Sequence, residues 1–141
     1  MTHITIGAEK VSLEKPVVMG ILNVTPDSFY DGGKYTSELK IMERVDEIVE
    51  QGAGIIDVGA YSTRPEAAFV DAQEELSRLS FAVELIRKYH PHLPVSIDTF
   101  RADVAKEITH CLGPISLMIF PGERWMTRCS RRWRNWDFLI S

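Results

Sequence analysis

Three short apolar segments recur at regular spacing in the first 110 residues of this chain, and each ends on or near a polar residue. They are residues 16–23 (PVVMGILN), 54–59 (GIIDVG) and 94–99 (PVSIDT), and they begin about 40 residues apart. A continuous apolar run of this length is typical of a strand buried on both faces of a parallel sheet. Parallel strands need a crossover connection, so the segments predict repeated βα units.

Helical periodicity fills the intervals between the apolar segments. Residues 37–52 and 71–90 each carry apolar side chains three or four positions apart, and residues 102–109 begin a third helix. The side chains that we expect to face the core are Leu39, Met42, Val45 and Val49 in the first helix and Leu76, Leu79, Val83 and Ile86 in the second. The predicted order is therefore β-α-β-α-β-α.

Residues that start or stop helices support these assignments. Gly52 is a suitable residue to end the first helix. Asp71 followed by Glu74 resembles a capping box at the start of the second helix, and Pro91 should end it.

Two architectures are built from such units, the open doubly wound sheet and the eight-stranded TIM (β/α)8 barrel. No G-x-G-x-x-G motif follows the first apolar segment, which disfavours a dinucleotide-binding sheet. Polar residues at three strand ends indicate side chains that converge on the C-terminal face of a barrel, where barrel enzymes carry their chemistry. We therefore expect an α/β fold, the N-terminal portion of a TIM barrel with about three βα units. It is expected to be incomplete, because a full barrel needs roughly 250 residues.

Composition narrows the class of protein. The chain has 141 residues, of which 45% are hydrophobic and 26% are charged, as in a soluble globular protein. It shows neither an apolar stretch long enough for a membrane helix nor the pattern of a signal peptide. Cys111 and Cys129 form no recognisable metal or redox spacing. A reduced, cytoplasmic protein is the expectation.

The first expected strand ends on Asn23 and leads into the loop VTPDSFYDGG. An amide oxygen at a strand end suits a hard cation, and Mg²⁺ usually takes only one or two protein ligands together with phosphate oxygens of a substrate. The alternative is a turn that leads into a helix, with solvated acids. The residues of this loop, taken alone, leave the two interpretations equally open.

The other two strand ends also carry polar residues. Ser62, Thr63 and Arg64 follow the second strand, and hydroxyls with a guanidinium suit a phosphate or diphosphate, although such a triplet is more often plain surface. Asp98 ends the third strand, where a carboxylate accepts hydrogen bonds from a guanidine-like edge of a heterocycle or else caps the next helix. Asp57 we interpret as structural, bonded to strand-end backbone.

The segments MGILNVTPDSFYDGG, DVGAYSTRPE and SIDTFRADVA closely resemble the first three strand–loop signatures of the dihydropteroate synthases, TIM-barrel enzymes of folate biosynthesis. The likeness covers about residues 1–110. It implies a transferase that condenses 6-hydroxymethyl-7,8-dihydropterin diphosphate with 4-aminobenzoate to give 7,8-dihydropteroate and diphosphate. It also implies Mg²⁺ as cofactor, small-molecule substrates rather than nucleic acid or membrane, and homodimers for full-length members.

The resemblance assigns roles to individual residues. The metal ligand falls on Asn23, Asp31 is implied to stabilise the cationic pterin methylene, and Asp98 is implied to bind the pterin ring. Arg64 is implied to act on the diphosphate and, with Asp31 and Asp98, makes up the implied catalytic set. The remaining implied substrate contacts are Phe29 and Pro65 beside the aminobenzoate and Ser62 and Thr63 beside the diphosphate.

Residues 111–141 differ in composition from the rest. They hold five arginines, no lysine, all three tryptophans and both cysteines. The resemblance predicts a fourth strand here, typically like GADIINDISGG. Two alternatives are open: an aberrant tail translated out of frame, which we favour, and a genuine basic, aromatic tail that binds nucleic acid or a partner.

The out-of-frame interpretation has support in the implied codons. Reading from the third nucleotide of each codon, Met118-Ile119 and Trp125-Met126 each force an aspartate, and residues 113–130 can be decoded as ADIINDISGGEMDDEMF. The predicted division is therefore a barrel portion at 1–110 and an aberrant tail at 111–141. Two alternatives to an active synthase follow, a non-catalytic truncated fragment and, disfavoured by N-V-T-P-D-S-F, a pterin-binding methyltransferase domain.

Overall fold

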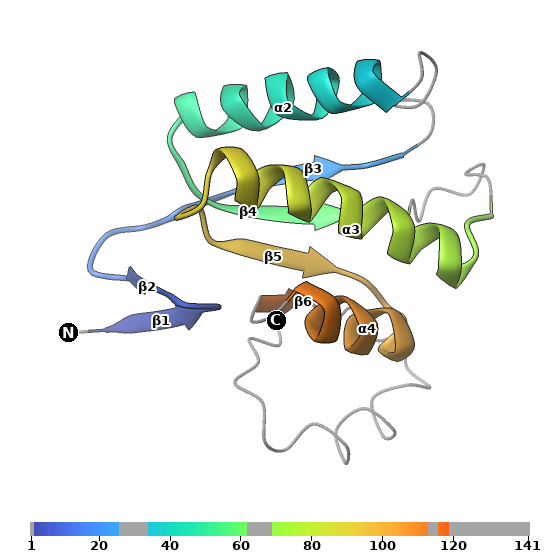
Figure 1. Cartoon of the computed structure of the whole chain (residues 1–141). Helices are drawn as coiled ribbons and strands as arrows, with labels where there is room; N and C mark the ends of the chain where they lie inside the picture. Colours follow the sequence, from blue (N-terminus) through green and yellow to red (C-terminus); the bar gives the residue numbers. More distant parts are fainter. Residues whose placement is uncertain (1, 26–33, 62–68, 113–115, 119–141) are drawn as a thin grey trace.

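The computed structural model describes residues 2–25, 34–61, 69–112 and 116–118. A short antiparallel hairpin comes first, and strands and helices then alternate (Figure 1). The elements in chain order are β1 (His3–Ile6), β2 (Glu9–Ser12), β3 (Val18–Asn23), α2 (Lys34–Glu50), β4 (Ala53–Gly59), α3 (Ala72–Tyr89), β5 (Val95–Asp98), α4 (Ala102–Leu112) and β6 (Ser116–Met118).

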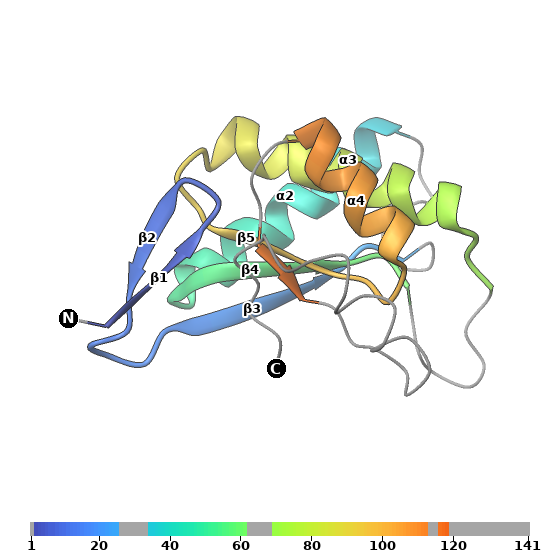
Figure 2. The same ribbon diagram turned by 90° about the horizontal axis from the view of Figure 1, so that it is seen from below.

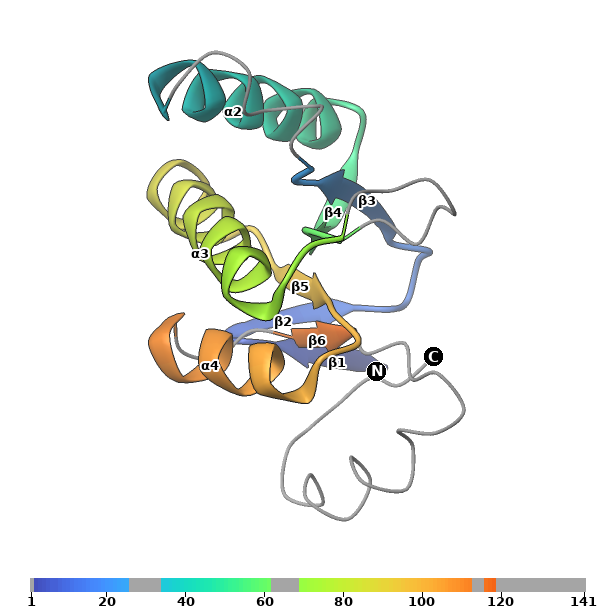
Figure 3. The same ribbon diagram turned by 90° about the vertical axis from the view of Figure 1, so that its right-hand side faces the viewer.

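The central sheet is parallel and its strand order, β3-β4-β5-β6, follows the chain. Helices α2, α3 and α4 all cover the same face of this sheet (Figures 2 and 3). A doubly wound sheet would place helices on both faces, whereas a barrel keeps them outside, so this arrangement is the barrel one. The predicted partial α/β barrel is confirmed.

A short fourth strand extends the three predicted βα units. Helix α4 continues past residue 110 to Leu112, and β6 then pairs with β5 in parallel, with Asp98 opposite Met118. All three residues of β6 thus lie in segment 111–141, whose composition differs from that of the rest of the chain. Whether residues 111–141 are out of frame stays a prediction.

The hydrophobic core lies between the sheet and its helices. Leu22, Val58 and Ile97 sit in one row of the sheet register, and each is at most 1% exposed. Their side chains face the helices, so the residues before and after them face the other side. In α3 the predicted core residues are confirmed: three are fully buried and one is partly buried, namely Leu79, Val83, Ile86 and Leu76.

The predicted core face of α2 was wrong for Leu39, which is 45% exposed. The face that packs on the sheet is centred on Ile41, Val45 and Ile48 instead. The reason is the close approach of α2 to β3: a Cβ added to Gly20 would lie 2.1 Å from Ile48 Cγ2. Ile48 therefore occupies the space that Gly20 leaves, and this contact fixes the rotation of the helix.

The helix boundaries follow the predicted signals. Gly52 has φ +96° and its N–H donates to the Val49 carbonyl at 2.9 Å just after the end of α2. Asp71 accepts a hydrogen bond from the Glu74 N–H at 2.8 Å at the start of α3, as a capping residue does. Within the described ranges, none of these helices combines the length and the hydropathy that crossing a membrane requires.

The β1–β2 hairpin was not predicted. Its two-residue turn begins with Gly7 at φ 63°, a conformation that two-residue hairpins require and glycine adopts readily. Ile6 and Glu9 line a pocket together with Pro94 and Val95, where β5 begins. The hairpin therefore lies at the N-terminal end of the sheet, opposite the strand ends that carry Asn23 and Asp98.

Candidate active site

Parallel pairing places Asn23, Gly59 and Asp98 side by side at the C-terminal ends of β3, β4 and β5. Because side chains alternate along a strand and the preceding row faces the helices, this row faces the helix-free side of the sheet. The structure thus brings together two residues that the sequence assigned to the site. They are separated by 75 positions in the chain and by one strand in space.

Gly59 leaves an opening between these two side chains. A Cβ built on Gly59 would lie 3.4 Å from Asn23 Oδ1 and 3.6 Å from Asp98 Oδ2. Both oxygens therefore border the same small space at the edge of the sheet. An amide oxygen and a carboxylate oxygen present an acceptor surface there, suited to a cation or to a ligand edge rich in N–H groups.

Asp98 has an unusual electrostatic setting. Its pKa is raised to about 6, first because burial disfavours the charged form and then because the Asp57 and Glu75 carboxylates lie near. A half-buried acid of this kind is stabilised as a carboxylate when a hydrogen-bond donor or positive charge reaches it. The site therefore favours a ligand that donates to Asp98.

Asp57 has a structural role, as predicted, but its partner differs from the expected one. It is 5% exposed, and Ser96 Oγ donates a hydrogen bond to its Oδ1 at 2.5 Å. The sequence had suggested strand-end backbone as the partner. Burial raises the pKa of Asp57 and the Ser96 hydrogen bond lowers it, with burial the larger cause. This side-chain bond links β4 to β5 two residues before Asp98, on the same face of the sheet.

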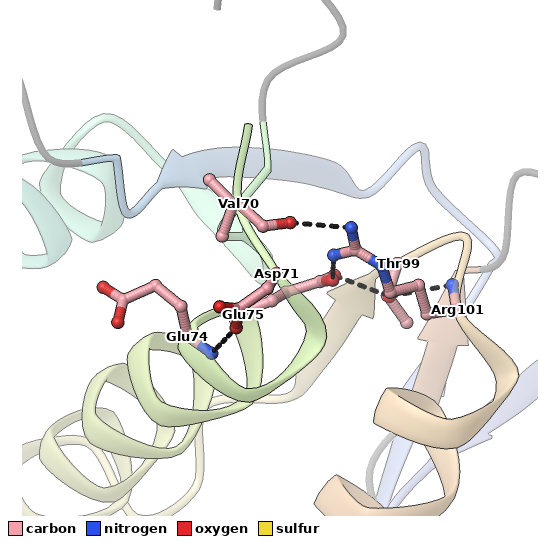
Figure 4. A network of polar contacts seen from close by, with 6 residues as sticks. All are labelled: Val70, Asp71, Glu74, Glu75, Thr99 and Arg101. Carbon is pink, nitrogen blue, oxygen red and sulfur yellow. Dashed lines mark hydrogen bonds and ion pairs between the residues drawn. The ribbon is translucent and has the colours of Figure 1, made fainter. Parts of the chain in front are cut away.

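A second polar network lies behind Asp98, between the start of α3 and the turn from β5 to α4 (Figure 4). Glu75 is fully buried and accepts hydrogen bonds from Thr99 Oγ1, at 2.6 Å, and from Arg101 Nη1. Arg101 Nη2 donates to the Val70 carbonyl at 2.7 Å. The Arg101 N–H donates to Thr99 Oγ1 at 3.2 Å, so Thr99 rather than Asp98 accepts this bond in the turn that leads into α4.

Six of the sequence-assigned site residues lie outside the described residues: Phe29, Asp31, Ser62, Thr63, Arg64 and Pro65. The predicted roles of these residues stay predictions. Within the described part of the chain, no three His, Cys, Asp or Glu side chains gather closely enough to hold a metal ion. Asn23 is exposed and offers a single amide oxygen, which fits a cation that takes most of its ligands from a bound diphosphate.

The comparison with known proteins decides the family. The sequence profile of the pterin binding enzyme family matches residues 19–115, more than half of the chain. The chain belongs to the pterin-binding enzyme family. The matched range runs from the second residue of β3 past the end of α4 and includes Asn23, Gly59, Asp98 and the Glu75–Arg101 network.

Relatives of this chain carry the name that the sequence motifs suggested. Dihydropteroate synthase of Bacillus subtilis (strain 168) is 52% identical over 94 residues, which are 67% of this chain and 33% of the relative. Dihydropteroate synthase from Vibrio fischeri ES114 superposes with a TM-score of 0.78 at 32% identity, over 99% of this chain and 50% of that one. The enzyme from Clostridium difficile, solved in the presence of pteroic acid, gives 0.76 at 37% identity, over 90% and 48%.

These shares show that the chain spans about a third of the length of the curated relative and about half of the solved ones. The sequence-based resemblance to the dihydropteroate synthases is confirmed over this part.

Sequence reasoning missed several residues that shape the C-terminal edge of the sheet. The sequence indicated Gly59 only as the end of an apolar run. A glycine in register between two polar strand ends leaves open space between their side chains. Thr99 and Arg101 stood in the segment SIDTFRADVA without an assigned role. Nothing in the sequence indicated that Glu75 is buried, because an acid in the first turn of a helix is normally solvated.

Proposed function

We propose that this chain is the N-terminal part of a dihydropteroate synthase and that its C-terminal sheet edge binds the pterin substrate. The single observation that carries the proposal is the placement of Asn23 Oδ1 and Asp98 Oδ2 around the open space at Gly59. The family membership and the relatives' names support it.

In the proposed reaction, 6-hydroxymethyl-7,8-dihydropterin diphosphate reacts with 4-aminobenzoate. The bond between the pterin methylene carbon and the diphosphate oxygen breaks, the aminobenzoate nitrogen bonds to that carbon and loses a proton, and 7,8-dihydropteroate and diphosphate result. The carboxylate of Asp98 accepts hydrogen bonds from the N–H edge of the pterin ring and orients it. The raised pKa of Asp98 means that these donors also stabilise its charged form.

The other roles are proposed from the sequence resemblance. Ser62, Thr63 and Arg64 bind the diphosphate, Phe29 and Pro65 border the aminobenzoate, and Asp31 stabilises positive charge on the methylene. We also propose a cytoplasmic location and small-molecule substrates.

We propose Mg²⁺ as the cofactor, with Asn23 as its protein ligand. When bound, Mg²⁺ neutralises charge on the diphosphate leaving group. Calorimetric titration with inorganic pyrophosphate, with and without Mg²⁺, tests this role. Asn23→Ala should reduce the Mg²⁺-dependent part of pyrophosphate binding. An equal Mg²⁺ dependence in the variant and the wild type would refute the assignment.

The test of the proposed function is binding and turnover by the purified chain. Pteroic acid, which joins a pterin to an aminobenzoate, should bind in a calorimetric titration, and Asp98→Asn should weaken it about 10- to 100-fold, the range of a hydrogen bond to a charged group. Asp103→Asn, an exposed acid at the start of α4, is the matched control and should bind normally. No binding by the wild type, or equal losses in both variants, would contradict the proposal.

A second candidate is a pterin-binding chain without turnover. The observation that favours it is the exposure of Met19, at 37%, and Ile21, at 61%, on the helix-free face of β3, which a closed barrel would place in its interior. An assay for 7,8-dihydropteroate with Mg²⁺ and both substrates separates the two candidates. Binding of pteroic acid with no product would favour the non-catalytic chain, and sustained turnover would exclude it.

A further inference from the structure

We propose that Arg101 is a positioning residue that holds Tyr61 and the pair Phe69-Val70, which flank segment 62–68 in the chain, against the strand end that carries Asp98. The inference rests on the proposed function for the identity of the ligand, and on the contacts of described residues for the positioning itself. Segment 62–68 carries Ser62, Thr63 and Arg64. The contacts that matter are made by its neighbours on either side, Tyr61 and the pair Phe69-Val70.

The residue before the segment is held by aromatic contacts. The Arg101 guanidinium lies 5.4 Å from the centre of the Tyr61 ring and 4.6 Å from that of Phe100. The Tyr61 and Phe100 rings meet edge to face, with 4.9 Å between their centroids. A guanidinium within about 6 Å of an aromatic ring is attracted by its π-electrons. The chain therefore leaves β4 and enters the segment from a point that Arg101 and Phe100 define.

The residues after the segment are held by the same guanidinium. Arg101 Nη2 donates to the Val70 carbonyl at 2.7 Å, and the guanidinium lies 5.9 Å from the Phe69 ring. Phe69 is 81% exposed, so little else buries it. One side chain, supplied by the turn before α4, thus contacts the chain on both sides of the segment.

Glu75 fixes the orientation of this guanidinium. The Glu75 side chain is 0% exposed and that of Arg101 is 17% exposed, so their ion pair is largely removed from water. If Arg101 moved away, the Glu75 carboxylate would stay buried without a partner, and the folded chain would be strongly destabilised. This cost restrains Arg101 to its position. The planar guanidinium can donate to Glu75 and to Val70 at once, from two different nitrogens, and lysine cannot reproduce that geometry.

The network also includes the residue that follows Asp98. Thr99 Oγ1 donates to Glu75 and accepts from the Arg101 N–H, so β5 ends in contact with the start of α3 (Figure 4). The strand end that carries Asp98 and the residues on either side of segment 62–68 are therefore tied to one pair of charges. Holding binding groups in place before the ligand arrives reduces the cost of ordering them.

The experiment compares Arg101→Lys with Arg44→Lys. Arg44 makes an exposed ion pair with Glu47 on α2, so its replacement removes the same chemical group away from the network. Amide hydrogen exchange should be about tenfold faster in the peptide covering residues 61–71 of Arg101→Lys, from the loss of a charged hydrogen bond. The peptide covering 34–50 should be unchanged, and Arg44→Lys should match the wild type at 61–71.

A second measurement addresses the ligand. Pteroic acid should bind Arg101→Lys about tenfold more weakly than Arg44→Lys, because the strand end that carries Asp98 is no longer held by the Glu75–Arg101 pair. Faster exchange everywhere, no change at 61–71, or unaltered affinity for pteroic acid would each overturn the positioning role. A wild-type chain that does not bind pteroic acid would refute the proposed pterin site, and the exchange comparison would still decide whether Arg101 holds Tyr61 and Val70.

A further variant covers the case in which Arg101→Lys does not fold. Glu75→Gln keeps an oxygen acceptor for Thr99 and Arg101 but removes the charge that orients the guanidinium. It should speed exchange at 61–71 in the same direction. Exchange at 61–71 equal to that of the wild type would overturn the inference.

Discussion

Asn23 and Asp98 lie on either side of Gly59, which has no side chain: Asn23 Oδ1 and Asp98 Oδ2 lie 3.4 and 3.6 Å from the point where a Cβ on Gly59 would be. The opening exists because three parallel strands end in register and the middle one ends on glycine. Filling the opening is therefore a direct way to separate ligand binding from folding.

Gly59→Ala should leave folding intact and weaken ligand binding. The added methyl group is in ordinary contact with its neighbours, and alanine in a strand is better than glycine by about 0.5–1 kcal/mol, so the free energy of unfolding should stay equal or rise slightly. Pteroic acid should bind about tenfold more weakly, because the methyl group occupies the space beside both oxygens. Urea unfolding and calorimetry measure the two effects. Unchanged affinity would show that the ligand does not use this opening.

Gly20→Ala should have the opposite profile, because its Cβ would lie 2.1 Å from Ile48 Cγ2. Overpacking of a core typically costs about 1–3 kcal/mol, so the midpoint of urea unfolding should fall. Ile48→Ala alone should also destabilise, by leaving a cavity.

The double variant Gly20→Ala/Ile48→Ala decides whether the contact is direct. Because the two side chains compete for one space, the double variant should be more stable than the sum of the single effects predicts. Additive losses would mean that α2 is not held against β3 by this contact.

The raised pKa of Asp98 should make the free energy of unfolding depend on pH. The pKa of Asp98 is about 6 in the folded chain against an ordinary value of 3.8, so between these values the folded chain binds more protons than the unfolded one. The contribution of Asp98 to stability is therefore fully present below pH 3.8 and is lost as the pH rises through about 6. Because the group is partly solvated, the loss should be on the order of 1 kcal/mol.

Asp98→Asn is the variant that isolates this effect. Urea unfolding of the variant and the wild type at intervals from pH 4 to pH 7 gives the difference between them, in which other titrating groups, including Asp57, largely cancel. The variant should gain stability relative to the wild type across this range. A difference that stays constant with pH would contradict the raised pKa.

The backbone plan of the sheet could be predicted from the sequence because its signals are local. Continuous apolar runs indicate buried strands. A polar residue at the end of such a run, as Asn23 and Asp98 are, indicates the edge of the sheet where functional side chains come together. The hairpin at Gly7 was missed because four-residue strands give too short a pattern to distinguish from a loop. The short strand β6 lies where the family resemblance predicts a fourth strand, but the residues of segment 111–141 gave no strand signal of their own. Backbone groups can complete a ladder beside β5 whatever the side chains are, so composition gives no warning.

The network behind the site could not be predicted, for a different reason. Glu75 and Arg101 are 26 positions apart, and nothing local distinguishes a buried acid in a first helical turn from a solvated one. Its burial depends on a partner that the fold brings close. The rotation of α2, which exposes Leu39, likewise depends on the space at Gly20 in another element.

Neighbouring residues of β3 provide the last prediction, because they face opposite sides of the sheet. Leu22 is 1% exposed beneath the helices, whereas Ile21 is 61% exposed on the helix-free face. Leu22→Ala should lower the free energy of unfolding by about 2–5 kcal/mol, and Ile21→Ala, at a surface position, by about 0.5 kcal/mol or less. Urea unfolding of the two variants at one pH makes the comparison. A loss at Ile21 as large as that at Leu22 would mean that a tightly packed layer covers the helix-free face in solution, and the opening beside Gly59 would then have to be reached from the C-terminal edge alone.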